Sequence, residues 1–88
     1  MQQNPPRPRH SLKSIPVFFQ ACWVGDKGFE IRKNDRDFQE RDEIVLCEWD
    51  GSEFTGREIY GIIRYLTQFQ QKEGFVVFAF EQTHRVDN

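Results

Sequence analysis

The hydrophobic period of the chain changes abruptly at Gly25. Before this glycine, four apolar side chains recur at helical spacing behind Pro16, a residue well suited to the first turn of a helix. The stripe consists of Phe18, Phe19, Cys22 and Trp23. After it, Phe29 and Ile31 alternate with charged residues, which is typical of a strand. The sequence therefore predicts a short helix that ends at Gly25 and is followed by a strand at residues 29–33.

Further strands are expected around this junction. We expect short strands at residues 10–14 and 75–80, and a strand at residues 43–49 whose two apolar faces favour a central position. Residues 57–66 fit either period, but Gly61 and the β-branched and aromatic content favour a strand. The predicted fold is α+β, mainly β: a small closed or half-closed barrel of about five or six mostly antiparallel strands with one short helix.

The chain has 88 residues, enough for one domain, which we place at residues 10–82. Residues 1–9 contain three prolines among glutamine and asparagine residues, and this composition predicts a disordered tail. Residues 83–88 are expected to form a frayed C-terminal tail. Nine phenylalanines supply a large apolar area for so short a chain, so a packed core requires the aromatic side chains to point inward.

The charge balance argues against a general polyanion-binding surface. The 12 basic and 14 acidic side chains give a formal net charge of -2, so any contact with RNA must be local. Cys22 and Cys47 lie in apolar patterns, which predicts free thiols in a reduced, cytoplasmic chain. The sequence contains no apolar segment long enough to span a membrane, so membrane contact is not expected. His10 and His84 are far apart and lack ligand-like spacing to cysteines or carboxylates, so neither a metal nor a cofactor is expected.

Lys27, Glu30 and Arg32 form the main candidate site. On a strand, Glu30 and Arg32 share one face, and Lys27 enters from the preceding turn, so the three charges can converge. The alternative is a solvated surface ion pair beside a free lysine. Arg36 and Arg57 are weaker candidates. Their alternatives are solvation in a turn for Arg36 and an ordinary cross-strand ion pair for Arg57.

The spacing Gly25-x-Lys27-x-x-Glu30-x-Arg32 resembles the signature of the ASCH family, part of the PUA-like superfamily. The resemblance runs from His10 to about Glu81 and includes His10-Ser11-Leu12-Lys13, Phe54-Thr55-Gly56-Arg57-Glu58 and the last strand. It implies a compact PUA-like barrel with a cleft, in a bacterial or phage protein. In the family, the turn before the strand at residues 43–49 is usually Gly-Asp. Arg41 replaces this glycine, which implies a different backbone geometry.

The resemblance implies RNA or nucleotide binding in the cleft. Lys27 and Arg32 would meet phosphate or a base carbonyl, and Glu30 would accept from an exocyclic amine, with Arg36 and Arg57 as further contacts. An alternative is a small hydrolase of acylated cytidine or RNA. Glu30 takes the place of the family's threonine nucleophile, so it would act as general base, with Lys27 and Arg32 stabilising the developing charge. A third possibility is a small adaptor for a protein partner.

Overall fold

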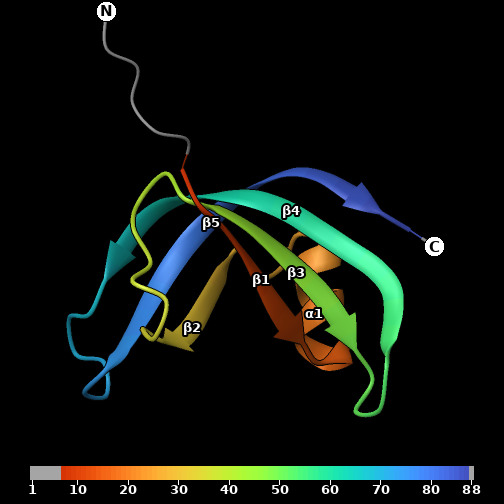
Figure 1. Ribbon diagram of the computed structural model, residues 1–88, viewed down its shortest axis with the longest axis horizontal. Coiled ribbons are helices and arrows are strands. Elements are labelled where there is room, and N and C mark those ends of the chain that lie inside the picture. The colour runs from red at the N-terminus through yellow and green to blue at the C-terminus, as the bar shows by residue number, and fades with distance from the viewer. Residues whose placement is uncertain (1–6, 88) are drawn as a thin grey trace, which may run out of the picture.

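The computed structural model describes residues 7–87, so residues 1–6 of the predicted tail lie outside the described part of the chain. The elements are β1 (Arg9–Ser14), α1 (Pro16–Trp23), β2 (Phe29–Lys33), β3 (Glu43–Trp49), β4 (Phe54–Thr67) and β5 (Phe75–Val86). One strongly curled sheet arches over α1, which lies on the concave side (Figure 1). The prediction of a mainly β half-barrel with one short helix is confirmed.

The five strands form one sheet in the order β1-β3-β4-β5-β2. β1 pairs with β3 in parallel, and the other three neighbouring pairs are antiparallel. β3 lies inside the sheet, as its two apolar faces predicted, and the ambiguous segment 57–66 is part of a strand. β4 has 14 residues and shifts register against β5 after Tyr60 and after Ile63. Such irregularities bend a strand and increase its twist, so the sheet curls.

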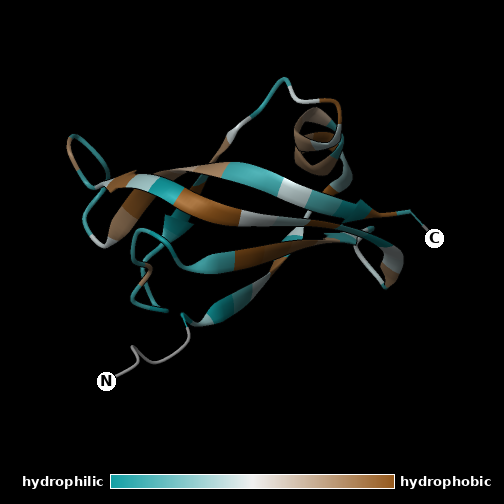
Figure 2. Cartoon of the chain, turned by 90° about the horizontal axis from the view of Figure 1, so that it is seen from above, coloured by the Kyte–Doolittle hydropathy of each residue, from teal (hydrophilic) through white to brown (hydrophobic). Residues whose placement is uncertain are grey.

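The helix joins the sheet through its C-terminal turn. Gly25 has a φ of 88°, the left-handed conformation that ends a helix, as predicted. The backbone N–H groups of Asp26 and Lys27 both donate to the carbonyl of Ala21, which directs the chain towards β2. Seen from above, α1 packs on one side of the sheet only (Figure 2). No helix within residues 7–87 has the length and apolar character needed to cross a lipid bilayer.

The core fills the space between the concave face of the sheet and α1. Leu12 points inward and Phe38 reaches the core from the loop before β3, both as predicted. The other members of this cluster are Phe19, Cys22, Ile44, Leu46, Ile59, Ile63, Val76, Phe78 and Phe80. Some of the aromatic side chains point inward, as a packed core requires, but others do not. The phenylalanines that remain exposed are Phe18, Phe29, Phe54 and Phe69.

The half-barrel is open between its two edge strands, β1 and β2, and arginine side chains span the opening. Arg32 on β2 donates to the carbonyl of Lys13 at 2.7 Å, and Arg36 donates to the carbonyl of Ser11 at 2.6 Å. Because Ser11 and Lys13 are two residues apart, their carbonyls face the same edge of β1. The guanidinium groups therefore satisfy acceptors that an edge strand would otherwise leave open.

One prediction about the backbone is wrong. The C-terminal segment is not frayed from Thr83, because β5 continues to Val86 in register with β4. There the ring of His84 stacks on Tyr60 at a centroid distance of 4.2 Å, and Arg85 donates to the carbonyl of Trp23 at 3.0 Å. These contacts join the last strand both to β4 and to the end of α1.

The turn before β3 contains a residue in an unusual backbone conformation. Arg41 has a φ of 82°, which lies in the left-handed region that glycine usually occupies. Hydrogen bonds to a neighbouring strand hold the turn in place. The N–H of Arg41 donates to the carbonyl of Ile63 at 2.8 Å, and the N–H of Ile63 donates to the carbonyl of Asp42 at 2.9 Å.

Candidate functional site

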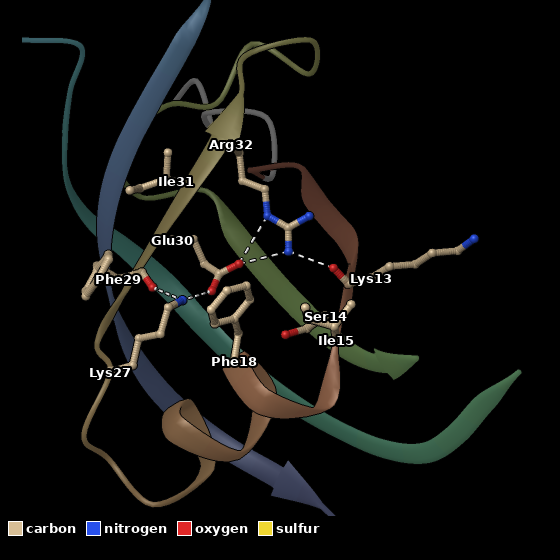
Figure 3. A pocket seen from close by; sticks show the side chains of 9 residues that line it. All are labelled: Lys13, Ser14, Ile15, Phe18, Lys27, Phe29, Glu30, Ile31 and Arg32. Atoms are coloured by element: carbon tan, nitrogen blue, oxygen red, sulfur yellow. Dashed lines mark hydrogen bonds and ion pairs between the residues drawn. The ribbon is translucent and has the colours of Figure 1, made fainter. Parts of the chain in front are cut away.

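The structure brings Lys27, Glu30 and Arg32 together around one carboxylate (Figure 3). The ammonium group of Lys27 pairs with Oε2 of Glu30 and also donates to the carbonyl of Phe29 at 2.6 Å. Arg32 donates to Oε1 of Glu30 from Nε at 3.1 Å and from Nη2 at 2.8 Å. Both oxygens of the carboxylate therefore have a cationic partner.

The charged face of β2 points into the molecule, whereas its apolar face is exposed. Glu30 is only 4% exposed, but Phe29 is 44% exposed and Ile31 is 55% exposed. A buried carboxylate requires partners that offset its lost hydration. The turn after α1 supplies one partner, Lys27, and β2 itself supplies the other, Arg32. An edge strand usually buries its apolar side chains and exposes its charged ones, and β2 does the reverse. This exposed apolar pair beside a buried ionic group marks the surface as a candidate site.

These residues line a cavity of about 420 Å³, which we call the Lys27 cavity. Its lining residues are Lys13, Ser14, Ile15, Phe18, Lys27, Phe29, Glu30, Ile31 and Arg32. The hydroxyl of Ser14 is buried and has no hydrogen-bond partner within residues 7–87. The ammonium group of Lys27 lies between two half-exposed rings, 4.9 Å from the centroid of Phe29 and 5.6 Å from that of Phe18. The cavity thus combines apolar walls with a charged floor and a free hydroxyl.

Cys22 lies behind this cavity. Its Sγ atom is 3.9 Å from Nζ of Lys27 and 3.9 Å from Oε2 of Glu30. Burial raises the pKa of the Cys22 thiol to about 11, since the core disfavours a thiolate. The thiol is therefore protonated at neutral pH and is a poor nucleophile. Both cysteines are free, as predicted, although only Cys22 is fully buried.

Arg36 and Arg57 do not line the Lys27 cavity. Arg36 lies beside it, at the opening between β1 and β2. Arg57 lies on another side of α1, where it donates to both oxygens of Glu48, at 3.0 and 3.1 Å, and to Oε1 of Gln20 at 3.0 Å. The hydrogen bonds from Arg57 hold the pKa of Glu48 below its ordinary value, and they raise the pKa of Arg57. The structure thus groups three of the five candidate residues in one cavity.

Sequence reasoning missed several residues of the cavity. The buried hydroxyl of Ser14 follows from the alternation of β1, in which His10, Leu12 and Ser14 are buried. Lys13 belongs to the segment that carries the family resemblance but is not among the predicted site residues, because its place beside Arg32 depends on how β1 and β2 approach each other. Phe18 belongs to the predicted apolar stripe of the helix, yet it is 52% exposed at the cavity wall.

The fold and the site define a small, mainly β half-barrel domain with a cavity of apolar walls and a charged floor on its open side. The chain belongs to a family described as Domain of unknown function (DUF3850), whose sequence profile matches residues 9–80. The match includes the whole Lys27 cavity and both edge strands.

The chain is also similar to a protein of Escherichia phage P2 described as "Uncharacterized 12.9 kDa protein in GpA 3'region". The two are 34% identical over 58 residues, which are 66% of this chain and 53% of the phage protein. The chain thus spans about half the length of this curated relative.

Proposed function

We propose that this protein is an RNA- or nucleotide-binding module that holds a nucleobase in the Lys27 cavity. The observation that carries the proposal is a cavity that combines exposed aromatic walls with N–H donors of Lys27 and Arg32 that are free or only weakly used. The resemblance of Gly25-x-Lys27-x-x-Glu30-x-Arg32 to the ASCH signature supports the same function. The net charge of -2 favours a local, selective site over a general attraction to nucleic acid.

The hydrogen bonds inside the cavity indicate which groups remain free for a ligand. An ammonium group has three N–H donors, and those of Lys27 face Glu30, the carbonyl of Phe29 and, at 3.9 Å, the Sγ atom of Cys22, which is a weak acceptor. Arg32 donates through Nε and Nη2, and its Nη1 group has no acceptor within residues 7–87. Arg32 therefore retains free donors for a base carbonyl or a phosphate oxygen, and Lys27 can exchange its weak contact with Cys22 for such an acceptor.

We propose a role for Glu30 that differs from the contact with an exocyclic amine that the resemblance implied. Oε1 accepts two hydrogen bonds from Arg32, and Oε2 accepts one from Lys27 and faces the thiol of Cys22. A carboxylate oxygen has two acceptor sites, so little capacity is left for the amine of a base. We assign Glu30 the task of positioning the two cations. The hydroxyl of Ser14 has no partner within residues 7–87, but it is buried, so we assign no direct ligand contact to it.

The walls of the cavity suit a flat ring. Phe18 and Phe29 are each about half exposed, and they stand on either side of the Lys27 ammonium group. Stacking on an aromatic side chain contributes about 1–3 kcal/mol per base and tolerates any base, whereas polar groups select among bases. A nucleobase meets both requirements better than a simple anion does.

Titration calorimetry with the four ribonucleosides and their 5'-monophosphates tests this proposal. We expect at least one base to bind, and Lys27→Met to weaken its binding roughly tenfold or more, because a hydrogen bond to a charged group is lost. Phe18→Ala should weaken the binding of all four bases to a similar extent. Arg64→Met is the matched control, since Arg64 pairs with Glu81 outside the cavity. Equal binding by wild type and Lys27→Met, with both proteins folded, would contradict the proposal.

The hydrolase alternative requires Glu30 to activate water. Its oxygens are already committed to Lys27 and Arg32, so we rank this activity second. Incubation with acetylated cytidine and with a short RNA, followed by product analysis, compares the two functions. Turnover by the wild type that Glu30→Gln abolishes would favour the enzyme over the binding module.

A further inference from the structure

A second hollow adjoins the Lys27 cavity on the open side of the half-barrel. Its volume is about 480 Å³, and we call it the β1 groove. It is lined by Ser11, Leu12, Lys13, Arg32, Arg36, Cys47 and Phe54. Lys13 and Arg32 line both hollows, so a ligand can extend from one to the other without leaving the protein surface.

The two hollows differ in charge. The Lys27 cavity contains the carboxylate of Glu30, whereas the residues that line the β1 groove include three cations and no carboxylate. These cations are Lys13, Arg32 and Arg36. In a chain with a net charge of -2, such a local excess of positive charge is a distinct feature. It complements a polyanion that follows the groove.

The cations of the groove are held in place. Arg32 and Arg36 are tied to the backbone carbonyls of Lys13 and Ser11, at 2.7 and 2.6 Å. Each of these guanidinium groups has five N–H donors, and neither is fully used by its contacts. A fixed donor loses less conformational entropy on binding than a free side chain does, so the groove is prepared for phosphate oxygens.

An aromatic platform lies at the far end of the groove. Phe54 is 53% exposed and meets Trp49 edge to face at a centroid distance of 4.8 Å. The ammonium group of Lys13 is 4.1 Å from the centroid of Trp49 and 5.9 Å from that of Phe54. A cation beside an exposed aromatic ring is the arrangement that proteins use to hold a phosphate next to a stacked base.

We propose that the β1 groove binds the phosphodiester backbone of a single-stranded nucleic acid whose neighbouring base occupies the Lys27 cavity. The next base along the strand stacks on Phe54. This inference rests on the proposed function and narrows the ligand class, because it makes an oligonucleotide, and not a free nucleoside, the preferred ligand.

Binding of a nucleoside, a dinucleotide and an oligonucleotide of about six residues, as RNA and as DNA, at several salt concentrations tests the inference. We expect the oligonucleotide to bind at least tenfold more tightly than the nucleoside. Its affinity should fall with salt, with a slope of roughly 0.7 for each phosphate contacted. The RNA and DNA arms report whether the groove distinguishes the two sugars.

Variants separate the charge of the groove from its structural role. Arg36→Gln should reduce the ratio of oligonucleotide to nucleoside affinity about fivefold and lower the salt slope by roughly 0.7. Arg36→Lys keeps the charge and should restore the slope. Phe54→Ala should weaken oligonucleotide binding about tenfold and leave the salt dependence of the affinity unchanged. Arg64 is a cation that does not line the groove, so Arg64→Gln should change neither the affinity ratio nor the salt slope.

The outcomes distinguish this inference from the proposed function. An oligonucleotide that binds no better than the nucleoside, or an Arg36→Gln protein with the wild-type salt slope, would overturn the inference. Nucleoside binding that depends on Lys27 would then still support the base cavity. Oligonucleotide binding that depends on Arg36 but not on Lys27 would support the groove and contradict the base cavity. Absence of all binding would overturn both.

Discussion

Arg32 Nη2 lies 2.7 Å from the carbonyl oxygen of Lys13, and this hydrogen bond joins the two edge strands of the half-barrel. The same guanidinium group pairs with the buried carboxylate of Glu30. The closure of the barrel and the organisation of the cavity therefore depend on one side chain. Because Arg32 has this structural role, Lys27 is the better residue for testing ligand binding.

Replacing Arg32 with methionine should loosen β1. The methionine keeps most of the apolar stem but removes the hydrogen bonds to Lys13 and Glu30, so the free energy of unfolding should fall by about 1–3 kcal/mol. Chemical denaturation measures this loss, and hydrogen exchange should show faster exchange of the β1 amides. Arg36→Met removes one backbone contact and should have a smaller effect. Unchanged exchange in β1 would show that Arg32 does not hold the seam closed.

Glu48 should make stability fall in acid. Hydrogen bonds from Arg57 and Thr55 lower the pKa of Glu48 below its ordinary value of 4.5. The folded state thus binds this proton more weakly than the unfolded state does, so the stabilisation is complete above about pH 4.5 and is lost as the pH falls through the lower, folded-state pKa.

The Glu48→Gln protein isolates this contribution. At neutral pH, it should be less stable by about 1–3 kcal/mol, since a hydrogen bond between charged groups is lost. The difference in stability between wild type and variant should shrink as the pH falls below 4.5. Urea denaturation across the acid range gives both curves. A difference that stays constant with pH would contradict the role of the Glu48–Arg57 pair.

Gly61 should not tolerate a side chain. A Cβ atom at this position would lie 2.8 Å from the carbonyl oxygen of Glu81 and 3.0 Å from Cδ2 of Phe80. Gly61→Ala should therefore lower the free energy of unfolding by about 1–3 kcal/mol through overpacking of β4 against β5. Gly28→Ala is the control, because a Cβ there meets no atom within 4 Å. Thermal denaturation of the two variants should separate them clearly; similar melting temperatures would disprove the steric argument.

Replacing Arg41 with glycine should stabilise the protein. Left-handed backbone costs a non-glycine residue roughly 1–2 kcal/mol, and the entropy of glycine in the unfolded state offsets about half of this gain. We expect a net increase of about 0.5–1 kcal/mol in the free energy of unfolding. Arg41→Ala, which removes the side chain and keeps the strained φ, should show no such increase. Destabilisation by Arg41→Gly would indicate that the arginine side chain holds the turn.

The strands with a clear apolar period were predictable from local sequence, and so was the helix between Pro16 and Gly25. Two features of the backbone were not predictable from local sequence. β5 extends to Val86 because β4 is long enough to pair with it, and the polar composition of residues 83–86 does not reveal that partner. Arg41 adopts the left-handed conformation because backbone hydrogen bonds that join Arg41 and Asp42 to Ile63 override a residue preference worth only about 1–2 kcal/mol.

The sequence by itself determined the grouping of Lys27, Glu30 and Arg32, because these residues lie within one turn and the start of one strand, where local geometry decides which side chains share a face. Only the tertiary structure decided that Glu30 is buried and Phe29 exposed, and that Lys13 and Ser14 join the cavity. The physical reason is the curl of the sheet. It brings β1 next to β2 without pairing their backbones, so contacts across the seam depend on the whole barrel and leave no pattern in either strand.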